Sequence, residues 1–186
     1  MNELNYLKGK RRNKMPFKLE FQSLKGLDKN KRAEKFSIAV NLAERCVNSN
    51  EFENIFLSSE FTQKGERSKL TNQELLYLLR QTVFLNYYVV PRPFWKRWSS
   101  VIGWTIIKET FFGPTGLTGI GSISTYEDKF DQMSVAELAS HIVHEAAHCP
   151  PARFEHYFNW SKERDMSIPY RIGAIVYDWV SKNLNK

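Results

Sequence analysis

Residues 134–151 carry the strongest secondary-structure signals of the chain, because they set both the start and the end of one helix. Ser134 followed by Glu137 is a capping box, in which the two side chains satisfy the first backbone amides of a helix. Pro150 and Pro151 end the helix, since the residue before a proline is pushed out of the α region. Apolar residues recur at helical spacing in between: Val135, Leu138, Ala139, Ile142, Val143 and Ala146. The sequence therefore predicts a helix of about four turns with one apolar face.

The last two turns of this helix contain His144-Glu145-Ala146-Ala147-His148. Residues i and i+4 lie on one face of a helix with their Cβ atoms about 5–6 Å apart, so both imidazoles can reach one Zn²⁺ ion at about 2.0–2.1 Å. Glu145 is rotated by about 100° from His144 around the helix. Its carboxylate can therefore flank the open coordination position and accept a proton from a zinc-activated water. All the histidines of the chain lie within residues 141–156, which favours a metal site over a chance match.

A catalytic zinc usually takes three protein ligands, so a third has to follow the helix. His156 is the first candidate, because residues 149–155 give the chain room to turn and bring this histidine back to the metal. The alternatives are acidic side chains further along the chain: Glu163, Asp165 and Asp178. His141 shares the helix face of His144 and His148 but lies one turn further from the open end. We expect His141 to pack behind the ligands rather than to bind the metal.

The two cysteines, Cys46 and Cys149, do not make a disulfide framework and indicate little about the compartment. We expect both to be ordinary buried thiols. Cys149 directly follows His148, but its side chain projects about 100° around the helix from it, which disfavours Cys149 as a ligand.

Several further helices are predicted. One runs from Asp28 to about Asn48, and Ser49 opens a short one that carries Phe52, Ile55 and Phe56. Thr71 and Glu74 form a second capping box, ahead of a helix over residues 71–79. A C-terminal helix has an apolar face made of Ile172, Ile175, Val176 and Trp179.

Strand signals occupy Val101–Thr105, Ile106–Phe112 and Gly121–Tyr126. Val89-Val90-Pro91-Arg92-Pro93 is expected to be a loop, because these residues cannot continue a helix and the prolines cannot lie in a central strand. The predicted fold class is α+β, with N-terminal helices, a small mixed sheet, the helix of residues 134–148 and the C-terminal helix.

The 186 residues, of which 42% are hydrophobic, are enough for one domain with a substantial core. Most of the net charge of +7 lies in residues 1–18, where six basic side chains face one acidic residue, Glu3. We therefore expect residues 1–27 to be a basic, poorly ordered arm that makes at most weak contact with a polyanion. Residues 28–186 are expected to be a single domain, and the protein a monomer.

No stretch of the chain reaches the about 18 uninterrupted apolar residues of a membrane span. Met1–Glu20 is interrupted by charges throughout and has no apolar core of a signal peptide. The chain as given is therefore expected to be cytoplasmic, or exported if a signal was removed from its start.

The motif and its surroundings resemble the zincin metallopeptidases, and among them the metzincins, in which a third histidine follows the H-E-x-x-H helix after a sharp turn. The resemblance implies that His156 is the third ligand, although metzincins have a glycine and a shorter gap where this chain has Cys149-Pro150-Pro151. Met166–Tyr170 is similar to the turn that metzincins run beneath the zinc. This likeness implies that Tyr170 approaches the metal or hydrogen-bonds the oxyanion. In zincins a strand before the zinc helix lines the cleft and pairs with an extended peptide, a role implied for Gly121–Tyr126; the alternative is an ordinary strand of the supporting sheet.

A looser likeness to small uncharacterised bacterial zincin-like proteins extends from about residue 33 onward. It rests on Val47-Asn48-Ser49, on Val101–Thr105 and on Ser167–Gly173. It implies that residues 28–186 are one zincin-like catalytic domain.

The sequence thus predicts a zinc-dependent metallopeptidase that hydrolyses peptide bonds of a protein or peptide substrate, with Glu145 as the general base. Two alternatives stay open. One is a zinc-stabilised interaction domain without turnover, in which Glu145 is structural. The other is a nucleic-acid-associated protease like the SprT-type zincins, which the basic arm favours, although the glycine-histidine-glycine stretch of those proteins is absent here.

Overall fold

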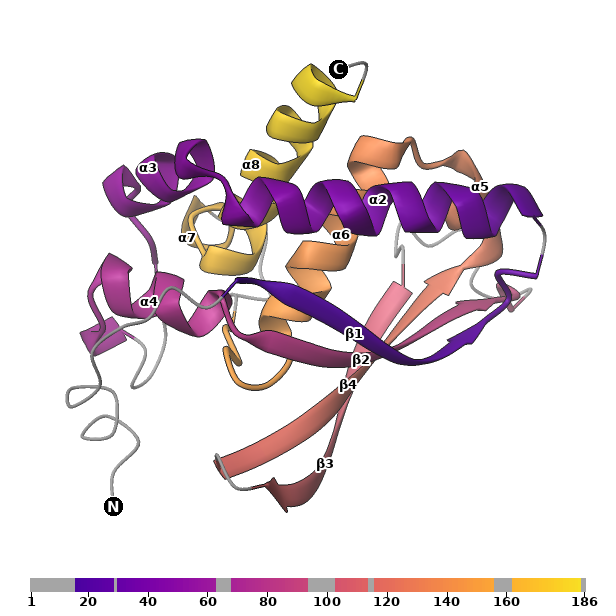
Figure 1. The fold of residues 1–186 in the computed structure, drawn as a ribbon, viewed down its shortest axis with the longest axis horizontal. Coiled ribbons are helices and arrows are strands. Elements are labelled where there is room, and N and C mark those ends of the chain that lie inside the picture. Colours follow the sequence, from indigo (N-terminus) through magenta and orange to yellow (C-terminus); the bar gives the residue numbers. More distant parts are fainter. Residues whose placement is uncertain are drawn as a thin grey trace.

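A four-stranded sheet and the helices packed on it form the fold (Figure 1). The computed structural model describes residues 16–28, 30–62, 68–93, 103–113, 116–155 and 162–184. The predicted combination of helices with a small mixed sheet is confirmed.

The strand order of the sheet is β1-β2-β4-β3. The strands are β1 (Lys18–Lys25), β2 (Thr82–Val90), β3 (Gly103–Gly113) and β4 (Gly116–Tyr126). β1, β2 and β4 run parallel to one another, whereas β3 pairs antiparallel with β4. In the described part of the chain β4 pairs with β2 through residues 121–126, so the far half of the β3–β4 hairpin extends beyond the other strands (Figure 1).

In the described part of the chain the helices are α2 (Asn30–Asn48), α3 (Asn50–Ser58), α4 (Asn72–Leu79), α5 (Glu127–Gln132), α6 (Val135–His148), α7 (Lys162–Asp165) and α8 (Ile168–Asn183). Three of the predicted caps are confirmed: Ser49 caps α3, and Thr71 and Ser134 form complete capping boxes at α4 and α6. The predicted C-terminal helix is α8, and its residues Ile172, Ile175 and Val176 are buried. None of the described helices is long and apolar enough to cross a membrane.

Helices cover one face of the sheet. Along β2 the side chains alternate, and Val83, Leu85, Tyr87 and Val89 are the buried ones. Successive side chains of a strand point to opposite faces, so this alternation marks one covered and one more open face. The Tyr87 ring packs on Phe36 of α2 with 4.6 Å between ring centroids, which identifies the covered face as the helical one.

The predicted arm over residues 1–27 is too long. Its second half forms β1, and Phe17, Leu19 and Leu27 are buried. The charged residues between them lie on the more open side of an outer strand, where charge is compatible with folding. Residues 1–15, which hold most of the predicted basic arm, lie outside the described residues.

The predicted loop at residues 89–93 is wrong at its start. Val89 and Val90 end β2, which is paired with β1 on one side and with β4 on the other. The prolines follow the strand, so the restriction on proline in a central strand does not reach these two valines.

Residues 103–112, over which two strands were predicted, belong to a single strand, β3. Residues 101 and 102 of the first predicted strand lie outside the described residues. Gly121–Tyr126 is a strand, as predicted, but it is not at the edge of the sheet. β2 flanks it on one side and β3 on the other. Of the described strands, β3 has the outer position beyond β4.

Two cations of α2, buried Arg32 and half-buried Lys35, fix the chain just ahead of α6. The Arg32 guanidinium is 7% exposed and donates to both carboxylate oxygens of Asp131, at 2.7 and 2.5 Å. The Lys35 ammonium donates to the carbonyls of Phe130 and Met133, at 2.5 and 2.6 Å. These charge-assisted bonds bind α5 and the short segment after it to α2, and so fix where α6 begins.

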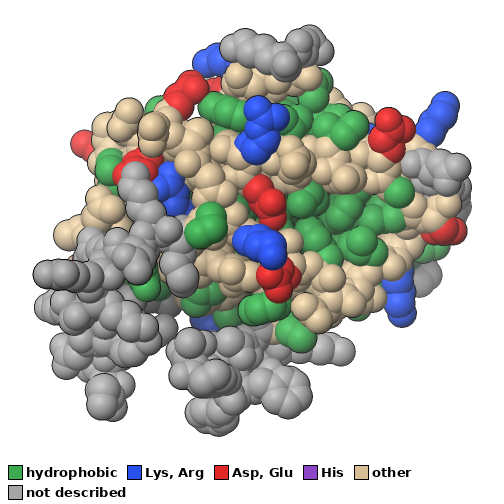
Figure 2. Space-filling model, viewed as in Figure 1, with side chains coloured by type: hydrophobic (Ala, Val, Ile, Leu, Met, Phe, Trp, Pro, Cys, Tyr) green, Lys and Arg blue, Asp and Glu red, His purple; other side chains and the backbone are tan. Residues whose placement is uncertain are grey.

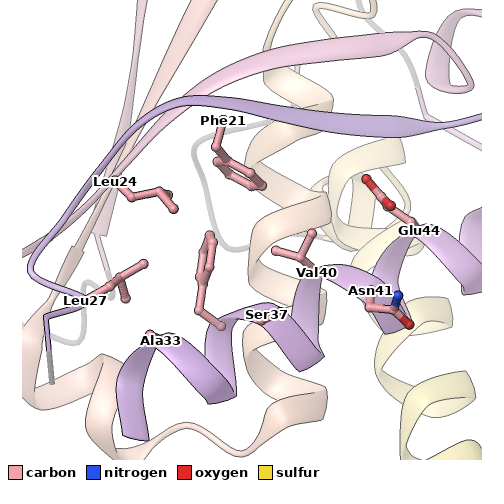
Figure 3. A pocket seen from close by; sticks show the side chains of 9 residues that line it. Phe21, Leu24, Leu27, Ala33, Ser37, Val40, Asn41 and Glu44 are labelled. Atoms are coloured by element: carbon pink, nitrogen blue, oxygen red, sulfur yellow. The ribbon is translucent and has the colours of Figure 1, made fainter. Parts of the chain in front are cut away.

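A hollow of about 370 Å³ opens between β1 and α2. Figure 2 shows hydrophobic side chains gathered on this face of the molecule. Figure 3 shows the lining, in which apolar side chains of both elements meet Ser37, Asn41 and Glu44 of the helix. Residues 144–148 are not part of this lining.

Candidate metal centre

The motif helix α6 runs along β4 in the opposite direction. At one end Thr125 Oγ1 lies 3.1 Å from His141 Nε2. At the other end a Cβ atom added to Gly121 would lie 2.1 Å from the Sγ of Cys149. From residue 121 to residue 125 the strand rises by about 13 Å, and from residue 141 to residue 149 the helix rises by about 12 Å. The two lengths match, so the helix and the strand can lie alongside each other over this distance. The motif therefore lies between two fixed contacts with the sheet.

His144 and His148 are neighbours on α6, with ring centroids 5.2 Å apart. This is the proximity expected from their i, i+4 spacing. The ring of Tyr170, in the first turn of α8, meets the His144 ring edge to face at a centroid distance of 4.7 Å. The Arg164 guanidinium lies 4.7 Å from the centroid of the same Tyr170 ring. The structure thus places Tyr170 next to the first motif histidine.

The turn that leads into α8 is fixed by contacts of its own. The Thr62 amide donates to the Met166 carbonyl at 3.0 Å, and the buried Ser167 hydroxyl donates to the Arg164 carbonyl at 2.6 Å. One turn further, α8 comes so near α6 that a Cβ atom on Gly173 would lie 3.7 Å from the Cβ of His144. Tyr170 on α8 therefore lies against His144 on α6 because these two helices pack closely.

The chain reverses direction directly after α6. The Phe154 amide donates to the Ala147 carbonyl at 2.9 Å, and the Phe154 carbonyl accepts a hydrogen bond of 2.6 Å from His148 Nδ1. A ring nitrogen that donates to a carbonyl carries the ring proton, so Nε2 of the neutral His148 ring has the lone pair that a metal requires. His156, two residues after Phe154, lies outside the described residues.

The acidic alternatives for the third ligand are all exposed side chains. Within the described ranges, no group of three His, Cys, Asp or Glu side chains is placed to hold a metal ion. Glu163 and Asp165 are exposed on α7, and Asp178 is exposed on α8. None of the three therefore completes a described three-ligand group with His144 and His148.

A buried polar chain connects Glu145 to the core. His141 Nδ1 lies 3.7 Å from Glu145 Oε1, and His141 Nε2 lies 3.1 Å from Thr125 Oγ1. Thr125 Oγ1 in turn lies 2.8 Å from the Tyr87 hydroxyl. Burial lowers the pKa of the His141 ring, although the Glu145 carboxylate acts against this shift. Burial also raises the pKa of Tyr87, so the imidazole stays neutral and the phenol keeps its proton.

His141 thus packs behind the motif, as expected, but its partners were not predicted. Thr125 and Tyr87 lie on two strands that are neighbours in the sheet and far apart in sequence. Alternation along each strand could have placed both side chains on the covered face. Nothing local indicates which helix residue they meet.

Cys149 is a buried thiol at the end of α6, as is Cys46 within α2. Burial raises the pKa of Cys149 to about 12, and the Glu145 carboxylate adds to that effect. Metal binding needs the thiolate, so Cys149 is poorly suited to be a ligand.

The described donor atoms fit zinc by their chemistry. Two imidazoles one turn apart are nitrogen ligands of the kind that Zn²⁺ takes, and a carboxylate stands between them in the sequence. The His148 ring has its second nitrogen bonded to a carbonyl, which is the usual support behind a zinc-binding histidine.

No protein-family model, no curated protein and no solved structure matches this chain.

Proposed function

We propose that this protein is a zinc-dependent metallopeptidase of the zincin type. The observation that carries the proposal is the pair His144 and His148, whose rings are neighbours on one helix, with the His148 tautomer set by the Phe154 carbonyl. That tautomer offers Nε2 to a metal. The arrangement of the elements also supports the proposal, because the motif helix α6 packs on a small mixed sheet and the C-terminal helix α8 packs on α6.

His144, His148 and His156 are the proposed ligands. The reversal after α6 supports His156, because it brings the Phe154 backbone against His148 only two residues before His156. The exposed positions of Glu163, Asp165 and Asp178 give the acidic alternatives no comparable support.

The proposed reaction is hydrolysis of a peptide bond. A zinc ion in this site would polarise the scissile carbonyl and make a water molecule more acidic. Glu145 accepts the proton of the attacking water and later delivers it to the leaving amine. Tyr170, whose ring lies against His144, donates a hydrogen bond from its hydroxyl to the oxyanion of the tetrahedral intermediate and keeps its proton.

The sheet supports an extended peptide as the substrate. β3 is an outer strand in the described sheet and runs antiparallel to β4, which packs on α6. An outer strand can pair with an added peptide strand through its backbone. We therefore assign the cleft-lining role, first expected for Gly121–Tyr126, to β3.

The test compares the wild type with Glu145→Gln at matched zinc content, on a broad peptide library and on peptidoglycan fragments. Glutamine has the size of glutamate but cannot accept the proton, so cleavage should slow by about 10²- to 10⁴-fold. Zinc content should stay at one ion per chain, because Glu145 is not a ligand. The double variant His144→Ala, His148→Ala is the control and should lose both the metal and the cleavage.

Two results would contradict the proposal. Full zinc occupancy in the double histidine variant would place the metal elsewhere. A zinc-loaded wild type that cleaves none of these substrates would favour the zinc-stabilised interaction domain.

A further inference from the structure

We propose that His141 is a positioning residue that orients the Glu145 carboxylate, and that Thr125 and Tyr87 fix the His141 ring for this task. The inference rests on the proposed function, because it concerns the general base of that reaction. Its physical basis is the buried chain Tyr87–Thr125–His141–Glu145, which joins two strands to the motif helix.

Both nitrogens of the His141 ring face a polar side chain. Nε2 lies within hydrogen-bond distance of the Thr125 hydroxyl, at 3.1 Å. Nδ1 faces Glu145 Oε1 at 3.7 Å, which is longer than a hydrogen bond. Catalytic hydrogen bonds are often long before substrate binds and shorten in the complex, so a small rotation of Glu145 would close this contact.

The chemistry of the groups sets the direction of donation. A glutamate that acts as a general base is ionised and can only accept, so the proton of the neutral His141 ring belongs on Nδ1. Nε2 then accepts from the Thr125 hydroxyl, and Thr125 Oγ1 accepts from the Tyr87 hydroxyl. Tyr87 thus donates to Thr125, Thr125 donates to His141, and the Nδ1–H group of His141 faces Glu145.

The Tyr87 end of this series of polar contacts is held firmly by the core. Tyr87 and Thr125 are fully buried. The Tyr87 ring contacts Phe36 at 4.6 Å, Phe130 at 6.4 Å and Phe21 at 6.5 Å between centroids. The Tyr87 hydroxyl is therefore fixed by rings from a strand and from two helices, and the hydrogen bonds transmit that position to His141.

Orienting the Glu145 carboxylate should increase the rate of proton transfer. A glutamate side chain has several rotatable bonds, and a misplaced base transfers protons less efficiently. A neighbouring N–H group aimed at one carboxylate oxygen restricts those rotations, as polar partners behind an active site do in general. His141 thus acts through Glu145 without touching the substrate.

Thr125→Val and Thr125→Ser form a matched pair for the test. Valine keeps the shape and removes the hydroxyl, whereas serine keeps the hydroxyl and removes a methyl group. Thr125→Val should lower kcat by about 10-fold or more with KM and zinc content unchanged, and Thr125→Ser should stay near the wild type. In a Glu145→Gln background Thr125→Val should have no further effect, because the two residues act as a unit.

A second measurement needs neither zinc nor substrate. Nitrogen-15 NMR of the histidine rings in the zinc-free full chain should find His141 neutral with its proton on Nδ1. Glu145→Ala removes the acceptor that faces Nδ1 and should release the ring into a mixture of tautomers. Protonation on Nε2, or equal losses of kcat in Thr125→Val and Thr125→Ser, would overturn the inference. Neither result would contradict the proposed function, because the wild type would still bind zinc and cleave peptides. A protein that binds no zinc and cleaves nothing would instead refute the proposed function, and the NMR result would then still decide whether His141 orients Glu145.

Discussion

Gly121 permits the close approach of the motif helix to the sheet. A Cβ atom at this position would lie 2.1 Å from Cys149 Sγ and 3.0 Å from Leu85 Cδ2. Cys149 directly follows His148 and donates its thiol proton to the Glu145 carbonyl at 3.4 Å. A single missing side chain on β4 therefore determines where the last turn of α6, with the second proposed ligand, lies.

Gly121→Ala should destabilise the protein by about 1–3 kcal/mol, because overfilling a packed site forces neighbouring atoms to move. The change should also weaken zinc binding, since the end of α6 is what moves. Urea unfolding and zinc titration measure the two effects. The double variant Gly121→Ala, Cys149→Ala removes the nearest atom and should recover part of the lost stability; a double variant as unstable as the sum of the single changes would contradict the clash.

At the residue scale, the sequence reveals which side chains share a helix face but not what meets them from other elements. The neighbouring rings of His144 and His148 follow from their spacing alone. The hydrogen bond from His148 to the Phe154 carbonyl depends on how the chain reverses after the helix. The contact between His141 and Thr125 depends on the register of a helix against a strand, for which no local signal exists.

Among the secondary-structure elements, α6 has the most clearly defined start. The Ser134 hydroxyl accepts from the Glu137 amide at 3.2 Å, and the Ser134 amide donates to the Glu137 carboxylate at 2.6 Å. The hydrogen bond from the Ser134 amide is the largest cause that lowers the pKa of Glu137 below its ordinary value of 4.5. A carboxyl with a lowered folded pKa contributes stability above its unfolded pKa, and this stability is lost as the pH falls through the folded value.

Glu137→Gln should therefore be less stable than the wild type at neutral pH, by about 0.3–1 kcal/mol, because it loses a negative charge at a helix N-terminus. The difference should vanish in acid, once the wild-type carboxyl is protonated. Urea unfolding of the metal-free proteins at neutral pH and below pH 4.5 measures it. Ser134→Ala is the companion variant and should lose about 1 kcal/mol. A Glu137→Gln difference that persists unchanged in acid would show that the charge is not its cause.

Helices were easier to predict than strands for a physical reason. A helix is closed by hydrogen bonds between near neighbours, so caps such as Ser49, Thr71 and Ser134 mark its start locally. β1 and β2 obtain hydrogen bonds from each other, although the described helices α2, α3 and α4 lie between them in the sequence. The charges in β1 and the prolines after β2 weaken the local strand signal of both segments, so neither strand was predicted.

At the scale of the whole molecule, the proposed metal would bind a helix that packs against segments far from it in the sequence. Buried residues from Phe17 in the N-terminal segment to Val180 in α8 share one core. α6 lies in contact with α2, with β4 and with α8, so its position depends on most of the chain. A ligand that binds the two α6 histidines together with His156 should therefore stabilise the entire fold rather than one helix.

Zinc should raise the melting temperature of the full chain. At about one hundred times its dissociation constant, a ligand that binds only the folded state adds about 2.7 kcal/mol, which for a protein of this size is roughly 5–10 °C. A chelator should remove this increase, and differential scanning calorimetry measures it. His156→Ala should abolish most of the zinc-dependent increase, whereas Glu163→Ala, Asp165→Ala and Asp178→Ala should keep it, because those acids are exposed and are not grouped with the motif histidines in the described residues. If Glu163→Ala lost the zinc effect and His156→Ala kept it, the third ligand would be the helix-borne glutamate, and the reversal at Phe154 would serve only to orient His148.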